Sequence, residues 1–222
     1  MIVKETLSEQ IYEQLRDDFF KKNIKFGDKL VNKDLQKRFS VSSTPVRDAI
    51  NKLKASGLVE STTNVGATVI TPDYEYFCEV NEYIKYMQVT ALNLSFQKAD
   101  KQQVVNEAGK CIEMQKKHIN DDNYFYYDTK FHKTFVDFSY NSFLKSSFKR
   151  NVTLQELLVR EYFESYSEFS EAQERLIKDH ENILRAYDEG DVNKACELML
   201  GHFDKGERYF RKTELNNVNV NS

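Results

Sequence analysis

Four side chains in the C-terminal two thirds of the sequence are of types that bind transition metals. Asp128 and His132 are four residues apart, so they lie on the same face of a helix. His180 and His202 each lie among apolar residues that recur at the helical period, which predicts that both imidazoles point toward the core. A buried carboxylate is costly unless it is paired or binds a metal. Three imidazoles and one carboxylate therefore predict a divalent metal site with open coordination positions.

In an alternative interpretation the histidines are separate core residues, and Asp128 forms an ion pair with His132. For any single histidine that interpretation is the more frequent one, because a histidine without other ligands nearby seldom binds a metal. The inward placement of all four residues favours a shared site instead. This set of nitrogen and oxygen ligands favours zinc, with nickel and manganese as alternatives. His118, in KKHINDD near a predicted helix end, is expected at the surface.

A second group of polar and basic side chains surrounds a helix predicted within FSVSSTPVRDAINKLKASGLVE, residues 39–60. The short hydroxyl residues at its start, together with the helix N-terminus, suit contact with phosphate. Arg47 lies one turn in and is long enough to grip a guanine or a phosphate with two hydrogen bonds. The predicted DNA contacts are Lys33, Arg38, Ser42, Ser43, Thr44, Arg47, Lys52, Asn64 and Gly66.

The elements expected to carry these DNA contacts follow the order of a winged helix-turn-helix. They are a helix over Ser8–Asn23, an extended Lys29–Val31, a helix capped by Asn32, the helix that starts after Ser42, and strands over Leu58–Thr62 and Ala67–Thr71. Any one of the polar residues alone would fit a capped surface helix with solvated charges. The ordered set favours a helix that reads the major groove of DNA.

Beyond Pro72 the apolar residues alternate three and four apart, which predicts helices, and no strand pattern follows. The helices are expected over residues 77–94, 100–119, 123–140, 142–167, 170–189 and 191–212. The predicted fold class is mainly α, with an N-terminal winged helix-turn-helix and a C-terminal all-α six-helix bundle. The expected domains are residues 1–72 for DNA binding, 73–213 for the helical domain with the metal cluster, and 214–222 as a disordered tail.

The composition of the 222-residue chain suits a largely helical globular protein, with 40% hydrophobic and 30% charged residues and only seven glycines and two prolines. No apolar run approaches the roughly 20 residues of a membrane span. The start, MIVKETLSEQ, lacks a signal-peptide pattern, and three cysteines without a CxxC pair suit a reducing cytoplasm. Residues 1–72 hold 12 basic against 9 acidic side chains, whereas residues 73–222 hold 20 against 26. A mildly basic module joined to an acidic domain is typical of a protein whose basic module contacts a polyanion and whose acidic domain does not.

Two parts of the sequence resemble a known family. GDKLVNKDLQKRFSVSSTPVRDAINKLKASGLVE with NVGATV is similar to the DNA-binding domain of GntR-family bacterial transcriptional regulators, over about residues 7–71, with Ser43 in place of the family's usual arginine and Phe26 in place of a proline. DTKFHKTFVDFSYN, KDHENILRAYDEGD and MLGHF resemble the three signature stretches of the helical FCD ligand-binding domain, found in the fatty-acid-regulator-like branch of that family. In its metal-binding members the matching positions are the ligands, here Asp128, His132, His180 and His202, while the branch's usual arginine on the first helix is replaced by Ile84.

The resemblance implies a DNA-binding transcriptional regulator, not an enzyme. A homodimer, held mostly by the helical domain, is expected to bind a pseudo-palindromic double-stranded DNA operator. A small organic acid bound at or near the metal is expected to control operator affinity, with repression relieved by the ligand as the commoner arrangement. The alternatives are a metal-sensing regulator and a helical metalloenzyme with a DNA-binding module. The sequence shows no general acid or base near the cluster, no phosphate-binding loop and no nucleophile motif, which weighs against the enzyme.

Overall fold

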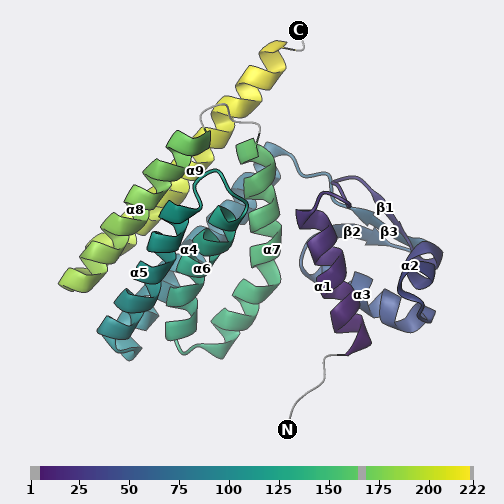
Figure 1. The fold of residues 1–222 in the computed structure, drawn as a ribbon, viewed down its shortest axis with the longest axis horizontal. Coiled ribbons are helices and arrows are strands. Elements are labelled where there is room, and N and C mark those ends of the chain that lie inside the picture. The colour runs from purple at the N-terminus through teal and green to yellow at the C-terminus, as the bar shows by residue number, and fades with distance from the viewer. Residues whose placement is uncertain (1–5, 165–168, 221–222) are drawn as a thin grey trace. The chain divides into compact units, whose positions relative to one another are not determined.

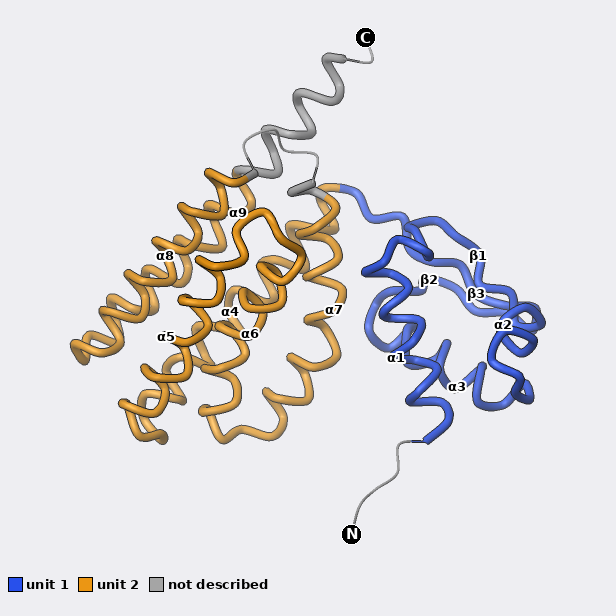
Figure 2. The backbone as a smooth tube through the Cα atoms, viewed as in Figure 1, with its two compact units in different colours: residues 1–73 blue, residues 74–222 orange. Residues whose placement is uncertain are grey.

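The structure is a computed structural model that describes residues 6–164 and 169–220, with side chains described over 6–161 and 170–208. The chain divides into two compact units, Met1–Asp73 and Tyr74–Ser222 (Figure 2). This division falls next to the domain boundary expected after residue 72. The predicted fold class is confirmed, because the first unit is a winged helix-turn-helix and the second is helical throughout its described residues.

Over its described residues, 6–73, the first unit contains three helices and a small antiparallel sheet of strand order β1-β3-β2 (Figure 1). Its elements are α1 (Leu7–Phe20), β1 (Lys29–Val31), α2 (Asn32–Phe39), α3 (Ser43–Ala55), β2 (Val59–Thr62) and β3 (Gly66–Val69). Leu15 of α1, Val46 and Leu53 of α3, and Leu58 after it are all fully buried. This apolar seam fixes α3 against α1 and leaves the opposite face of α3 exposed.

The capping of two helices differs from the sequence prediction. Asn32 is the first residue of α2 and does not cap it, because its Nδ2 donates a hydrogen bond to the carbonyl of Asn64 at 3.0 Å. The carbonyl of Val65 accepts from the Asn32 backbone N–H at 2.9 Å. Ser42 occupies the N-cap position of α3 with extended backbone, but its hydroxyl makes no capping hydrogen bond within the described residues. Asn32 therefore ties the start of α2 to the turn between β2 and β3.

The second unit is a bundle of six helices over the described residues (Figure 1). They are α4 (Tyr74–Lys98), α5 (Lys101–Lys117), α6 (Asn123–Phe138), α7 (Ser142–Glu164), α8 (Phe169–Glu189) and α9 (Val192–Val220). The Asp100 carboxylate caps α5 as predicted, accepting a hydrogen bond from Gln103 N at 2.9 Å. Helix α4 packs on α6, α7 and α9, while α5 packs on α6 and α8. Helices α8 and α9 pack on each other, and ring contacts of His132 with His180 and His202 join α6 to both.

The end of one helix differs from prediction. Helix α9 continues to Val220, beyond the predicted end at residue 212 and into the segment 214–222 expected to be disordered. No glycine or proline interrupts TELNNVNV, so nothing in the sequence stops the backbone ladder there. Helix α7 is described as far as Glu164, and the rest of its predicted range, like residues 221–222 of the tail, lies outside the described residues. No helix of the described chain is long and apolar enough to cross a membrane.

Candidate metal centre and DNA-binding face

The three histidines predicted as ligands come together in the core of the helical unit. His132 of α6, His180 of α8 and His202 of α9 each offer a ligand nitrogen, and these atoms lie within 4.8 Å of one another. His180 Nε2 and His202 Nε2 are 3.3 Å apart. Two nitrogens bound to one tetrahedral ion at its usual bond length are roughly 3.4 Å apart. The imidazoles are buried and converge at a spacing that suits a metal ion.

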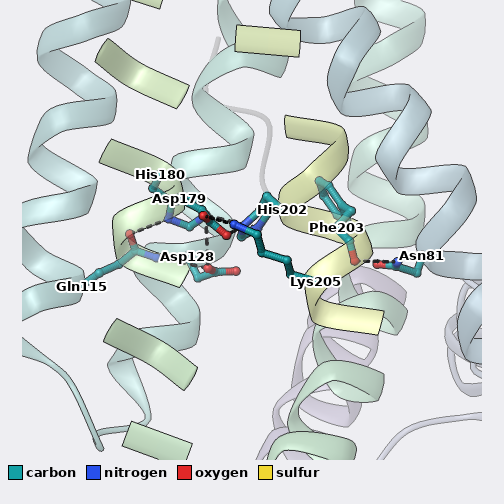
Figure 3. Close-up of polar contacts among 8 residues, drawn as sticks. All are labelled: Asn81, Gln115, Asp128, Asp179, His180, His202, Phe203 and Lys205. Carbon is teal, nitrogen blue, oxygen red and sulfur yellow. Dashed lines mark hydrogen bonds and ion pairs between the residues drawn. The ribbon is translucent and has the colours of Figure 1, made fainter. Parts of the chain in front are cut away.

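Asp128 joins this cluster through a hydrogen-bonded chain that begins on α5 (Figure 3). Gln115 Nε2 donates to Asp128 Oδ1 at 3.1 Å, so Gln115 Oε1 is the atom that lies 3.0 Å from His180 Nδ1. Because a carbonyl oxygen can only accept, His180 must carry its proton on Nδ1. That tautomer leaves the lone pair of His180 Nε2 directed at the cluster, 3.8 Å from Asp128 Oδ1.

An acidic and a basic side chain flank His202 from the other side (Figure 3). Asp179 Oδ2 lies 4.0 Å from His202 Nδ1, and Lys205 Nζ lies 2.5 Å from Asp179 Oδ1. Neither Asp179 Oδ2 nor His202 Nδ1 has a hydrogen-bond partner among the described residues. A carboxylate behind a ligand histidine is the usual support of a metal site, and it favours the tautomer with a free Nε2.

Burial sets the protonation of the cluster. It lowers the pKa of His132 and of His180 well below the usual value, and the neighbouring imidazoles lower both further. Burial also lowers the pKa of His202 to about 4, although Asp179 opposes the shift. Asp128 is half-buried, with 24% of its side chain exposed; desolvation raises its pKa to about 7, and the charge of Glu156 adds to this. At neutral pH the three imidazoles are therefore uncharged, which is the form that binds metal.

The donor set therefore fits a divalent ion. It offers three neutral imidazoles, one carboxylate and an orienting hydrogen bond on His180. The alternative of unrelated core histidines does not match this convergence. His118 lies apart from the cluster, at the α5 C-terminus, and is half-buried although it was expected at the surface. Its Nδ1 is 3.3 Å from Asp121, and its ring stacks on Tyr127.

The predicted DNA-binding side chains lie mostly on the exposed face of the first unit. Ser42, Thr44 and Arg47 are exposed along the first turns of α3, Lys33 is exposed on α2, and Ser43 is half-buried. A cavity of about 500 Å³ lies between α3 and the β2–β3 hairpin. Its polar lining includes Arg47, Asn51, Thr62, Thr63 and Asn64. The recognition helix and the wing therefore share one polar groove, of a kind suited to a sugar-phosphate strand.

Three of the predicted DNA contacts also have partners inside the unit. Arg38 forms an ion pair at 2.6 Å with Asp18, which is only 2% exposed. Lys52 forms an ion pair with Glu9 of α1. Gly66 is buried, and a Cβ there would lie 2.1 Å from the Leu30 carbonyl oxygen, so close pairing of β1 with β3 requires the glycine. These residues thus have structural roles that the sequence did not reveal.

Comparison with known proteins agrees with both units. Residues 7–69 match the family model described as bacterial regulatory proteins, gntR family, and residues 79–205 match the FCD domain. The chain belongs to the GntR family. It is a DNA-binding transcriptional regulator with a helical FCD effector-binding domain, and FCD domains often bind metal.

Relatives of this GntR-family regulator share its length and fold. It is 24% identical over 198 residues to the uncharacterised HTH-type transcriptional regulator YdhC of Bacillus subtilis, covering 88% of this chain and 87% of the relative. It is 26% identical over 190 residues to the gluconate operon transcriptional repressor of the same organism, covering 82% and 75%. The structure of E. coli McbR/YncC matches 95% of this chain and 100% of its own at a TM-score of 0.75 and 16% identity, which shows a shared fold.

Sequence reasoning missed Gln115 and Asp179 and gave Asn32 the wrong role, although all three organise the GntR and FCD domains. Gln115 orients His180 and contacts Asp128, Asp179 lies behind His202, and Asn32 holds the wing turn. The role of Gln115 could have been predicted from the sequence, because Gln115 continues the buried stripe of α5. The apolar residues of that stripe are Val104, Ala108, Cys111 and Ile112. A polar residue on an apolar helix face needs a buried partner, and here the partners are on α6 and α8.

Proposed function

We propose that this GntR-family regulator is a homodimeric repressor whose affinity for a pseudo-palindromic operator is controlled by a small carboxylate effector. The effector binds at a divalent metal in the FCD domain. The observation that carries this proposal is the convergence of three buried imidazoles from three different helices. A buried cluster of neutral imidazoles contributes little to stability by itself, so a bound cation is the simplest reason for it.

The ion would be held by Asp128, His132, His180 and His202, with zinc favoured over nickel or manganese by the nitrogen-rich set. When bound, it supplies a positive charge and open coordination positions for a carboxylate. The chain's own residues set the geometry, because Gln115 holds the His180 tautomer and spaces it from Asp128.

The DNA-binding role rests on the exposed start of α3 and the polar groove beside the wing. Lys33, Ser42, Ser43, Thr44, Arg47 and Asn64 would contact the operator, while Arg38, Lys52 and Gly66 act largely by holding the domain together. GntR-family regulators are usually dimeric, and two copies of a short recognition helix read two half-sites. The carboxylate effector also agrees with one relative's name, which refers to the operon of gluconate, itself a small carboxylate.

The test combines metal analysis with selection of bound duplexes from a random pool. Purified protein should contain about one divalent ion per chain and should enrich a two-fold-symmetric site. His180→Ala should lose most of the metal and the response to carboxylates, whereas the matched His118→Ala variant should keep both. Full metal occupancy in His180→Ala would refute the ligand set. Operator release on metal removal alone, without any carboxylate, would make the protein a metal sensor.

A further inference from the structure

One fully buried amide in the FCD domain is left without partners. Gln88 of α4 is 0% exposed, and neither its Oε1 nor its Nε2 has a hydrogen-bond partner among the described residues. Leaving both a donor and an acceptor unsatisfied in the core is costly. Gln115 is equally buried, yet both of its amide atoms are bonded, to Asp128 and His180. Gln88 is therefore the exception among the two buried core glutamines of α4 and α5.

Contacts on either side place Gln88 at the level of the histidine cluster. Seven residues earlier on the same helix, Asn81 Nδ2 donates to the Phe203 carbonyl at 3.4 Å (Figure 3). Five residues later, Asn93 Nδ2 contacts Cys196 Sγ at 3.0 Å. Helix α4 thus runs antiparallel to α9, with Gln88 opposite the middle of the α9 segment between Cys196 and Phe203, about one turn from His202.

The packing of α6 against α4 also places Gln88 near the height of the histidine cluster along the bundle. Lys98 Nζ at the end of α4 donates to the carbonyl of Ser139 at the end of α6 at 3.0 Å, so these two helices run in the same direction. Ten residues before these ends lie Gln88 on α4 and Thr129 on α6, and Thr129 is within one turn of His132. The ring of Phe203 lies 5.2 Å from that of His132 and 5.3 Å from that of His202, measured between centroids. The unsatisfied amide therefore belongs to the same layer of the bundle as the metal cluster.

The charges around this layer are already balanced. Lys85, one turn before Gln88 on an adjacent face of α4, forms an ion pair with Asp204 at 2.8 Å. Lys205 forms one with Asp179 at 2.5 Å. An anion that enters this layer therefore finds its positive partner in the metal, and Gln88 offers it one neutral donor and one neutral acceptor.

We propose that Gln88 is a ligand-binding residue of the effector site and that it reads an uncharged polar group of the effector. The effector is then a monocarboxylate that also carries a hydroxyl or amide group, with the carboxylate at the metal and the neutral group at Gln88. A second carboxylate would be buried without a cation, and a plain alkyl acid would leave the amide unsatisfied. This inference rests on the function proposed above.

Matched acids test the chemical class on the zinc-loaded full-length protein by titration calorimetry. The hydroxy monocarboxylates are lactate and gluconate, propionate and hexanoate lack the hydroxyls, and malate and glucarate add a second carboxylate. At least one hydroxy monocarboxylate should bind tenfold or more tightly than both of its matched acids. In Gln88→Leu that preference should disappear. Equal affinity for hydroxylated and plain acids in the wild-type protein, as expected if Gln88 binds only a buried water, would overturn the inference.

Stability without any ligand gives a second readout. Gln88→Leu should raise the melting temperature of the metal-free protein by about 2–4 °C, because it replaces an unsatisfied amide with an apolar group of similar size. Gln115→Leu is the matched control and should lower the melting temperature, since it breaks two hydrogen bonds. A lower melting temperature for Gln88→Leu would show that its amide has protein partners, against the inference.

The two proposals fail in different ways. Binding of any acid that persists in His180→Ala, or without zinc, contradicts the metal-anchored function and with it the inference. Zinc-dependent binding that shows no hydroxyl preference and is unchanged in Gln88→Leu leaves the proposed function standing and removes only the role of Gln88.

Discussion

Zinc affinity of the FCD domain should fall about fivefold from pH 7 to pH 6 and about tenfold for each pH unit below that, and a single carboxyl group should be the cause. Burial and the nearby charge of Glu156 raise the pKa of Asp128 to about 7. At pH 6 roughly one molecule in ten then carries the ionised carboxylate that binds metal, and at pH 8 roughly nine in ten do. Zinc must displace a proton from Asp128 at the lower pH, so acid competes with the metal.

The histidines should add nothing to this slope above about pH 6. The pKa of His202 is lowered to about 4, and burial keeps the pKa of His132 and of His180 well below the ordinary value. All three are therefore already neutral when zinc arrives, and they release no proton. Imidazoles with ordinary pKa values would each steepen the slope below pH 6.5. The expected slope is close to one proton per zinc, and Asp128→Asn should remove it.

Competition with a chromophoric chelator between pH 5.5 and 8 measures the slope, once the chelator's own proton binding is calibrated. Calorimetry at pH 6 in two buffers of different ionisation enthalpy counts the released proton independently. Glu156→Gln should move the onset of the fall to lower pH, because Glu156 is one cause of the raised pKa of Asp128. A flat profile between pH 6 and 7, or a slope of two or more, would refute the assignment to Asp128 alone.

Three further predictions concern the DNA-binding unit. Arg47→Ala should weaken specific operator binding by about 1–3 kcal/mol, measured by fluorescence anisotropy. The control is Lys54, which is exposed at the other end of α3; Lys54→Ala should leave the ratio of specific to nonspecific affinity unchanged. Arg38→Ala should destabilise the unit in urea denaturation by about 1–3 kcal/mol, because it strands the buried carboxylate of Asp18. Adding Asp18→Asn should restore most of that loss. Gly66→Ala should push β1 from β3, lowering the unit's melting temperature and abolishing operator binding while zinc stoichiometry persists.

Most helices were predictable because their signals are local. The periodic apolar stripe, Asp100 at an N-cap and Gly190 at a left-handed helix end fix most starts and stops of the bundle helices within a few residues. The exception is the end of α9, which lies at Val220 instead of the predicted residue 212. The same periodicity pointed His180 and His202 inward. Their convergence was a hypothesis at that stage, since it depends on how α8 and α9 pack.

The supporting residues were beyond local reasoning because each depends on a partner far along the chain. Asn32 looks like a helix cap in sequence, yet its amide bonds the turn at Asn64, 32 residues later. Arg38 looks like a free phosphate contact, yet Asp18 of α1 is its partner. Charge type and spacing cannot separate a solvated cation from a paired one, since only tertiary packing brings the carboxylate close.

In the proposed regulation, α4 matters because it is the bundle helix that directly follows the DNA-binding unit in the chain. An effector changes operator affinity only by binding one arrangement of the protein better than another. The metal cluster joins α6, α8 and α9, so an ion alone leaves α4 without a bond to the site. A ligand that also contacts Gln88 connects α4 to the site. Only residues 70–73 separate α4 from β3, the last strand of the wing. Of the bundle helices in the described chain, α4 is the one joined to the DNA-binding unit by a short stretch of backbone. An effector that contacts both Gln88 and the metal could therefore change operator affinity by moving α4.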